Sequence, residues 1–302
     1  MKEIVVISGK GGTGKTSLVA SLAALSETPV LADCDVDAAD LHLVLEPRIK
    51  HREDFSGGKS AEIIPDRCSN CGKCFELCRF EAIIKDESKQ PAFSVDPIGC
   101  EGCGVCSHFC PEEAIDFKPS INGQWFISDT RYGPMVHARL GIAEENSGKL
   151  VSLVRGEARK IAEEKGLSYI IVDGPPGIGC PVIASVTGSD GVLIITEPTV
   201  SGEHDLDRVA ELVRHFRIPA FLCINKYDLN QEMSDKIEEK ARGDGIKPVG
   251  RIRYDRSVTR AQVQKVPVVE INGSTAAEDI KKVWELLVAE ISKNNNNNNE
   301  EV

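Results

Sequence analysis

The chain has 302 residues and a formal net charge of −11 at pH 7. This length fits one large domain or one domain with an insertion, and the acidic balance argues against binding a nucleic-acid backbone. No apolar run reaches the roughly 18 residues that a membrane-spanning helix needs, and the N-terminus does not have the pattern of a signal peptide. We therefore expect a cytoplasmic protein without stable membrane association and without nucleic acid as a partner.

The first predicted strand, residues 3–8, leads into a glycine-rich turn and then into a run with helical spacing at residues 17–25. The turn fits the pattern G-x-x-x-x-G-K-[ST], in which backbone N–H groups and a helix N-terminus bind phosphate. We expect Lys15 to contact the β- and γ-phosphates and Thr16 to bind Mg²⁺; the alternative is a chance glycine turn. The expected nucleotide-binding residues of the turn are Gly9, Lys10, Gly11, Gly12, Thr13, Gly14, Lys15, Thr16 and Ser17.

A second lysine, Lys10, starts the sequence Lys-Gly-Gly-Thr-Gly-Lys-Thr, so the turn resembles the deviant Walker A loop of the MinD/ParA class. That class includes Mrp-type iron–sulfur carriers and the nitrogenase iron protein. The resemblance implies that the nucleotide is ATP and that the chain forms an ATP-dependent homodimer or a heterodimer with a paralogue. It also implies that Lys10 reaches the phosphates bound by the other subunit, so that Lys10 and Lys15 both serve catalysis.

The second predicted strand, residues 29–32, ends in Asp33-Cys34-Asp35. The carboxyl ends of parallel strands are where such sheets bind their ligands. The resemblance to MinD-type proteins implies that Asp35 polarises the attacking water, and we assign that catalytic role to Asp35 alone. An aspartate-rich, solvated helix cap over residues 33–40 is the alternative interpretation.

Residues 46–61 are rich in Pro, Gly and charged residues, which predicts a linker. The chain has 11 cysteines, and eight of them form two runs in which Cys100 follows Cys68 by 32 residues. The same offset relates Glu-Ala-Ile at 81–83 to Glu-Ala-Ile at 113–115, so we predict an internal duplication. In a reducing compartment such cysteine clusters bind metal rather than form disulfides.

Both runs have the spacing C-x₂-C-x₂-C-x₃-C, which resembles that of bacterial two-cluster ferredoxins, where the fourth cysteine of each run binds the other cluster. A zinc site is the competing interpretation. Arg79 stands where the ferredoxin pattern has proline. The resemblance assigns Cys68, Cys71, Cys74 and Cys110 to one [4Fe–4S] cluster, and Cys78, Cys100, Cys103 and Cys106 to the other.

After the cysteine runs we predict strands at 124–128 and 134–140 and a helix over 147–165. A further buried strand, 168–173, ends in Asp173 and is followed by Gly-Pro-Pro-Gly. This element resembles the Walker B and switch II segment of the MinD class, which implies that Asp173 holds Mg²⁺ through water.

Three more strand-and-helix units start with strands 191–196, 220–225 and 246–252. Strands and helices that alternate in this way predict an α/β fold with a mostly parallel, doubly wound sheet. Asn225 and Asp228 lie at a strand end where we expect contact with the base. The same segment spells N-K-x-D, the guanine-binding motif of GTPases, so GTP stays open as an alternative to ATP.

The final predicted helix, residues 275–293, has an apolar face of ordinary width, so we expect it to pack on the core rather than on a membrane. The asparagine-rich tail, residues 294–302, is expected to be disordered. His108 and His137 are expected to be structural or surface residues rather than metal ligands.

Cys180 lies seven residues after Asp173. In the nitrogenase iron protein, a cysteine at this offset binds a cluster that bridges two subunits. We therefore consider Cys180 either a redox or interface thiol or a small packing residue. Cys34 and Cys223 lie in predicted buried strands and are poor candidates for the same role.

The whole chain resembles MinD-superfamily P-loop ATPases that carry an inserted two-cluster ferredoxin domain. We expect a discontinuous ATPase domain at 1–61 and 119–293 and a small α+β, ferredoxin-like insertion at 62–118. The resemblance implies that ATP hydrolysis in a sandwich dimer drives electron transfer through the clusters to a redox partner protein. The alternatives are an ATPase that assembles or carries an iron–sulfur or other metallocofactor, and a positional ATPase with structural clusters.

Overall fold

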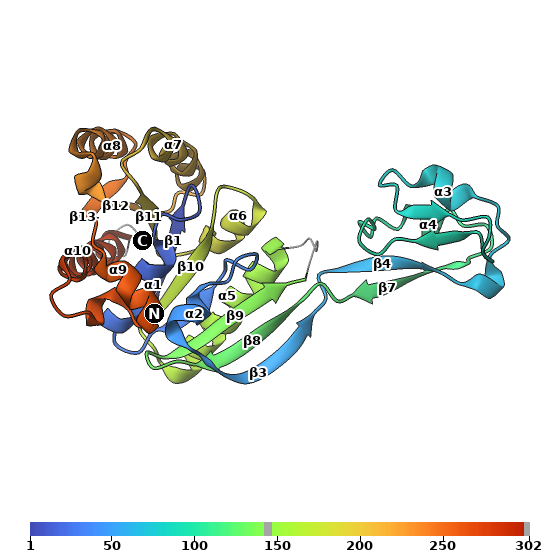
Figure 1. The fold of residues 1–302 in the computed structure, drawn as a ribbon, viewed down its shortest axis with the longest axis horizontal. Helices are drawn as coiled ribbons and strands as arrows, with labels where there is room; N and C mark the ends of the chain where they lie inside the picture. Colours follow the sequence, from blue (N-terminus) through green and yellow to red (C-terminus); the bar gives the residue numbers. More distant parts are fainter. Residues whose placement is uncertain (142–146, 299–302) are drawn as a thin grey trace. The chain divides into compact units, whose positions relative to one another are not determined.

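The computed structural model describes residues 1–141 and 147–298 (Figure 1). The chain forms two compact units. The larger comprises residues 1–52, 125–139 and the chain from Ser147 onward, and the smaller comprises residues 53–124 and a short stretch that begins at Leu140. The smaller unit thus includes residues 62–118, where the insertion is expected, and extends beyond them on both sides.

Within the described residues, a nine-stranded sheet runs in the order β13-β12-β11-β1-β10-β2-β9-β8-β3. The neighbouring pairs from β13 to β9 are all parallel. The predicted α/β class with a large, mostly parallel sheet is therefore confirmed. The strands are β1 (Lys2–Ser8), β2 (Val30–Asp33), β3 (Arg48–Phe55), β8 (Gly123–Asp129), β9 (Pro134–Leu140), β10 (Tyr169–Pro176), β11 (Gly191–Thr196), β12 (Ala220–Asn225) and β13 (Lys247–Ile252).

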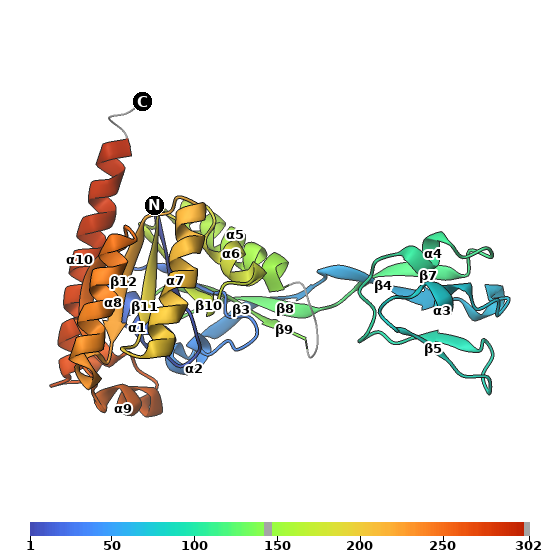
Figure 2. The ribbon, with the colours of Figure 1, turned by 90° about the horizontal axis from the view of Figure 1, so that it is seen from above.

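Helices cover both faces of this sheet. Helices α2 and α10 pack on α1, and helices α1, α9 and α10 all contact the short segment that follows α9. Helix α5 packs on α6, and α7 packs on α8. Figure 2 shows α5 and α6 on one side of the sheet and α2 and α9 on the other. The helices are α1 (Lys15–Leu25), α2 (Leu41–Leu45), α5 (Ser147–Lys165), α6 (Cys180–Val186), α7 (Val200–His215), α8 (Gln231–Gly243), α9 (Ser257–Gln264) and α10 (Thr275–Asn298).

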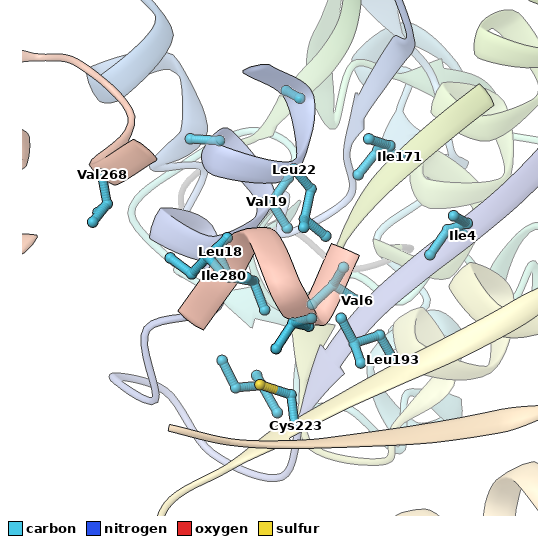
Figure 3. Packing of buried hydrophobic residues seen from close by; sticks show 14 of the residues in the cluster. Ile4, Val6, Leu18, Val19, Leu22, Ile171, Leu193, Cys223, Val268 and Ile280 are labelled. Atoms are coloured by element: carbon cyan, nitrogen blue, oxygen red, sulfur yellow. The ribbon is translucent and has the colours of Figure 1, made fainter. Parts of the chain in front are cut away.

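The apolar core lies between the sheet and helices α1 and α10. Leu18 and Leu22 of α1 and Ile280 of α10 belong to one buried cluster with Val6 of β1 (Figure 3). Burying an aliphatic side chain of this size stabilises the fold by about 1.5–3 kcal/mol. The prediction that the last helix packs on the core is confirmed, because its apolar positions are buried in this cluster.

The linker prediction for residues 46–61 is wrong. Strand β3 and the start of strand β4 (Gly58–Ile63) occupy this segment. Every residue of β3 except Phe55 is exposed, because β3 is the last strand at one end of the sheet. An exposed edge strand tolerates charged side chains on both faces. Its composition is therefore similar to that of a linker, which explains the wrong prediction.

Helix α10 continues to Asn298, so the prediction of disorder is wrong for residues 294–298. Extending a helix that has already formed requires ordering one residue per added hydrogen bond, which is far easier than starting a new helix. The rest of the predicted disordered tail, residues 299–302, lies outside the described residues.

The smaller unit contains two antiparallel strand pairs. Strand β4 pairs with β7 (Ile115–Ser120), and β5 (Ile83–Lys85) pairs with β6 (Phe93–Val95). Two short helices, α3 (Lys73–Leu77) and α4 (Val105–His108), pack against each other. The architecture is α+β, and the more specific ferredoxin-like assignment stays a prediction.

The sequence duplication is also a duplication of backbone conformation. Gly72 and Gly104, which are related by the 32-residue offset, precede α3 and α4 with φ values of 77° and 75°. Glu81 and Glu113 share a left-handed conformation at the same offset, with φ values of 54° and 48°. Left-handed backbone is rare for glutamate, so its recurrence shows that the two halves fold in the same way.

Candidate functional site

The glycine-rich turn connects β1 to α1 with a backbone that only glycine accepts at several positions. Gly12 and Gly14 have φ values of 80° and 89°. A Cβ atom on Gly9 would lie 2.1 Å from the Cβ of Asp205, and one on Gly14 would lie 2.5 Å from Nδ2 of Asn225. No side chain caps the N-terminus of α1, so its backbone N–H groups are available to a phosphate.

A cavity of about 450 Å³ lies at this turn. Its wall includes residues 11–17, Asp35 and residues from two helices that no motif indicated. Leu43 and Val44 come from α2, and Gln262 comes from α9. The sequence carried no signal for these three residues, because they join the site only through tertiary packing.

Lys15 lies among three carboxylates at the carboxyl ends of neighbouring strands β2 and β10. Its Nζ donates to Oδ1 of Asp173 at 2.6 Å and lies 3.5 Å from Oδ2 of Asp35. Burial by itself lowers the pKa of Lys15, but the charges of Asp173, Asp35 and Asp33 raise that pKa above its usual value. The ammonium group is therefore held in its charged form.

Two of these carboxylates keep one oxygen without a hydrogen-bond partner. Asp33 and Asp173 are almost fully buried, and in each of them Oδ2 has no partner within the described residues. Burial and the nearby charge of Asp173 raise the pKa of Asp33 well above its usual value. Buried, unpaired oxygens are unfavourable on their own, and carboxylate oxygens are the ligands that Mg²⁺ prefers. The residues present thus fit Mg²⁺, with Thr16 also in the cavity wall.

Lys10 is bound within its own chain, at the start of α7. Its Nζ donates to Oγ of Ser201 at 3.0 Å and lies 3.7 Å from Oε2 of Glu197. Lys226 donates to the same Glu197 carboxylate at 2.5 Å, so Glu197 lies between two cations. The role of Lys10 in a dimer stays a prediction.

Asn225 and Asp228 both contact backbone groups. Nδ2 of Asn225 donates to the carbonyl of Thr13 at 2.7 Å, which supports the glycine-rich turn. Oδ1 of Asp228 accepts the N–H of Tyr254 at 2.7 Å. Neither residue belongs to the wall of the 450 Å³ cavity, and their contact with a base stays a prediction.

The remaining candidate side chains in the larger unit are separate from the cavity. Cys180 is exposed at the first position of α6, whereas Cys34 and Cys223 are fully buried, as expected. Burial raises the pKa of the Cys223 thiol to about 12. His137 is buried, lies 2.9 Å from Oγ of Ser128 and stacks on a phenylalanine ring, which is the structural role expected of it.

The smaller unit has two cavities that are each lined by four cysteines. In both, three cysteines come from one run and the fourth comes from the other run, and each cavity has a volume of about 20 Å³. The structure therefore brings together the same two sets that the sequence assigns to two clusters. The first set is Cys68, Cys71, Cys74 and Cys110, and the second is Cys78, Cys100, Cys103 and Cys106.

Among residues 1–141 and 147–298, no group of three or more His, Cys, Asp or Glu side chains is arranged to hold a metal ion. A zinc ion needs four ligands that converge on one point, with sulfurs at about 2.3 Å from the metal. Neither cysteine set converges on one point in this way among the described residues. Binding of iron–sulfur clusters by these sets stays a prediction.

Residues 4–268 match the CobQ/CobB/MinD/ParA nucleotide binding domain. The chain belongs to this family. Its larger unit is accordingly that of an ATP-binding P-loop ATPase of the MinD/ParA type.

Two uncharacterized proteins of Methanocaldococcus jannaschii are similar in sequence to this member of the MinD/ParA family. One is 35% identical over 289 residues, which cover 94% of this chain and 96% of the relative. The other is 28% identical over 236 residues, which cover 76% of this chain and 82% of the relative.

Solved structures of MinD proteins have the same fold. The septum site-determining protein MinD of Pyrococcus horikoshii, complexed with Mg-ADP, matches with a TM-score of 0.57 at 16% identity and covers 95% of each chain. The cell division ATPase MinD of Pyrococcus furiosus matches with a TM-score of 0.56 at 17% identity, over 95% of this chain and 98% of that one. These likenesses show that the chain has the fold of MinD proteins.

Within the part of the chain that the structure describes, no helix is both long and apolar enough to cross a membrane.

Proposed function

We propose that this protein is a MinD-type ATPase that couples ATP binding and hydrolysis to electron transfer through two [4Fe–4S] clusters bound by its smaller unit. The observation that carries the proposal is the exchange of fourth cysteines between the two runs at the two cavities. Such an exchange is the ligand pattern of two-cluster ferredoxins. One-electron transfer is the chemistry that such clusters supply when they are bound.

The cysteine sets fit clusters better than single metal ions. In a cubane cluster each of four thiolates binds a different iron, so the sulfur atoms surround a space rather than a point. The lining of each cavity by four cysteines, three from one run and one from the other, supports this arrangement. The ligand sets are those that the sequence assigns, Cys68, Cys71, Cys74 and Cys110 and their counterparts.

Nucleotide binding in this proposal starts from the contact between Lys15 and Asp173. Incoming phosphate oxygens compete for Nζ of Lys15, which then leaves the carboxylate. Thr16 and, through water, Asp173 would hold Mg²⁺, which would supply positive charge next to the carboxylates. Asp35 lies in the cavity wall, where it orients the water that attacks the terminal phosphate.

The path of the chain supports coupling between the nucleotide and the smaller unit. The chain leaves the larger unit at Arg52 on β3, returns at Trp125 on β8, and leaves again after Arg139 on β9. Strand β9 pairs with β2, with His137 opposite Asp33. A movement of the segment that follows β2, which contains Asp35, can therefore be transmitted to β9 through the pairing of these two strands. Strand β9 is one of the strands that connect the two units.

Dimerisation supplies the second half of the proposed site. Lys10 is a cation that the 450 Å³ cavity of its own chain does not use, and its present partners, Ser201 and Glu197, hold it by one hydrogen bond and one long ion pair. ATP bound by a second copy offers stronger acceptors. In this proposal Lys10 exchanges its contacts within the chain for phosphate across the dimer.

The likeness to MinD favours a second candidate, a positional ATPase whose clusters are structural. A carrier that delivers an iron–sulfur or other metallocofactor to a partner protein is the third. The three candidates share ATP hydrolysis and differ in what happens to the clusters. A carrier loses them to a partner protein, a positional ATPase keeps them at constant potential, and an electron-transfer ATPase changes their potential with nucleotide.

The test is anaerobic purification with iron and sulfide counts, followed by cluster potentials with and without Mg-ATP. We expect about eight irons and eight sulfides per chain, as two cubane clusters require. ATP should shift the potentials in the wild-type protein but not in Lys15→Ala, which serves as the control for nucleotide binding. If ATP changes the cluster potentials in neither protein, the proposed coupling is wrong. Transfer of the clusters to an apo-acceptor protein would indicate the carrier function.

A further inference from the structure

Among the described residues that line the nucleotide cavity, Gln262 is the only one that follows Pro176 in the sequence. It lies on α9, and its Nε2 donates to Oγ of Ser17 at 3.2 Å. Ser17 is buried in the first turn of α1, two residues after Lys15. The hydrogen bond thus joins two residues that are 245 positions apart in the sequence.

Helix α9, which carries the exposed Gln262, is anchored at its N-terminus. The carboxylate of Asp255 accepts the N–H of Ser257 at the start of α9 and the N–H of Ala276 at the start of α10. Burial by itself raises the pKa of Asp255, but these hydrogen bonds lower that pKa well below its usual range. Ala261, the neighbour of Gln262, is buried in the main core. The amide is therefore carried by a helix that is anchored at its N-terminus and along one face.

The direction of the hydrogen bond decides what Ser17 can do. A hydroxyl group has one proton and two lone pairs. Because Oγ of Ser17 accepts from the amide of Gln262, the proton of that hydroxyl remains available to an acceptor in the cavity. Phosphate oxygens only accept hydrogen bonds, so a hydroxyl oriented in this way is a suitable phosphate donor at the helix N-terminus.

We propose that Gln262 is a positioning residue of the nucleotide site, which orients the Ser17 hydroxyl toward a phosphate of the bound nucleotide. The inference rests on the proposed ATP binding and adds to it a contribution from α9. Gln262 acts on nucleotide affinity rather than on the hydrolytic step, because its amide donates to Ser17 and not to Asp35 or Lys15.

Substitution of Gln262 by residues of similar size tests the proposal. Gln262→Met removes the amide donor and should weaken binding of both ADP and ATP by about 2- to 12-fold, the range for one lost hydrogen bond. Gln262→Glu should weaken nucleotide binding by at least about 10-fold. The carboxylate would accept a hydrogen bond from the Ser17 hydroxyl, which then no longer donates to phosphate, and it would add negative charge near the phosphates. In both variants KM for ATP should rise while kcat stays within about 2-fold, since the hydrolytic groups are unchanged.

The matched control is Gln264→Glu, which makes the same change of charge two positions further along α9 at a residue outside this cavity. It should bind ATP like the wild type. The double variant Ser17→Ala/Gln262→Met should bind no more weakly than Ser17→Ala alone, because the two residues act through one contact. Thermal unfolding without nucleotide distinguishes a loss of nucleotide contact from a loss of stability. A purely structural role of Gln262 would lower the melting temperature of Gln262→Met.

Wild-type affinity in the Gln262→Glu protein, or additive losses in the double variant, overturns the role of Gln262 and leaves ATP binding intact. Failure of the wild-type protein itself to bind ATP in the same titration overturns the proposed function instead. The two failures are therefore distinguishable in one experiment.

Discussion

Lys15 and Asp173 form a direct, hydrogen-bonded ion pair. Bound phosphates and Mg²⁺ would separate the two side chains. Nζ of Lys15 donates to Oδ1 of Asp173 at 2.6 Å, and both side chains are buried. The lysine is thus a counter-charge for the carboxylates of Asp33, Asp35 and Asp173. Nucleotide binding and stability of the larger unit therefore depend on the same cation.

Lys15→Met should abolish measurable ATP binding and also destabilise the nucleotide-free protein. Removing one partner from a buried ion pair costs about 3–5 kcal/mol, here because three carboxylates lose their cation. The measurement is urea unfolding of the nucleotide-free protein at pH 7.5. Asp173→Asn in the Lys15→Met background should recover part of the loss, since it removes one of the repelling charges; no recovery would contradict the electrostatic explanation.

Lys10→Ala should abolish ATP-dependent dimerisation while ATP binding by the monomer stays within about 3-fold of the wild type, because Lys15 remains in place. Asp35→Ala should have the opposite effect and accumulate the ATP-bound dimer, since the group that orients the attacking water is gone. Sedimentation velocity with Mg-ATP measures both. A Lys10→Ala protein that dimerises normally would show that the lysine acts only within its own chain, on Ser201 and Glu197.

Cys78→Ser should disturb the cluster whose other ligands are Cys100, Cys103 and Cys106, because those four thiols line one cavity. Cys110→Ser should disturb the other cluster. In each variant we expect loss or conversion of one of two clusters, which anaerobic EPR and iron analysis can measure. If Cys78→Ser instead removes the cluster near Cys68, each run binds its own cluster and the exchange is refuted.

His137 makes stability depend on pH in a defined direction. Burial, together with the charge of His42, lowers the pKa of His137 to about 4. An unfolded histidine has a pKa of about 6.5, so between these values the unfolded chain binds a proton that the folded chain does not. Stability should therefore be lost as the pH falls from about 6.5 toward 4, with a limit of about 3 kcal/mol.

The measurement is urea unfolding at a series of pH values for the wild type and for His137→Gln, which should show a flatter profile in this range. His215→Gln is the control, because His215 is an exposed residue at the end of α7. Equal profiles for the wild type and His137→Gln would mean that other groups cause the loss of stability.

Cys180 is exposed at the start of α6, after the Gly-Pro-Pro-Gly segment that follows Asp173. If it lies at an ATP-dependent dimer face, Mg-ATP should slow its alkylation by at least about 5-fold in the Asp35→Ala protein, where the dimer accumulates. Mass spectrometry of Cys180, with buried Cys223 as an internal control, follows the labelling. If the protein dimerises but ATP does not change the labelling rate of Cys180, then Cys180 lies outside the interface.

Local chemistry explains which features of this protein can be predicted from its sequence. The glycine-rich turn, the aspartates at strand ends and the repeated cysteine spacing are each specified by a few neighbouring residues, because they depend on φ values and on side chains only a few positions apart. The helix over 147–165 and the strands over 191–196 and 220–225 have the predicted bounds. Their apolar patterns match burial on one face of a helix or on both faces of a sheet.

Tertiary structure alone decided the contacts between distant segments. The charged strand β3 forms because β8 offers it an edge, which no local preference of Arg48–Phe55 indicates. Gln262 reaches Ser17, and Glu197 holds Lys10, only because the folded sheet places α7 and α9 beside the turn. Such side chains lie in no motif, since the free energy of each contact depends on packing that the whole fold supplies.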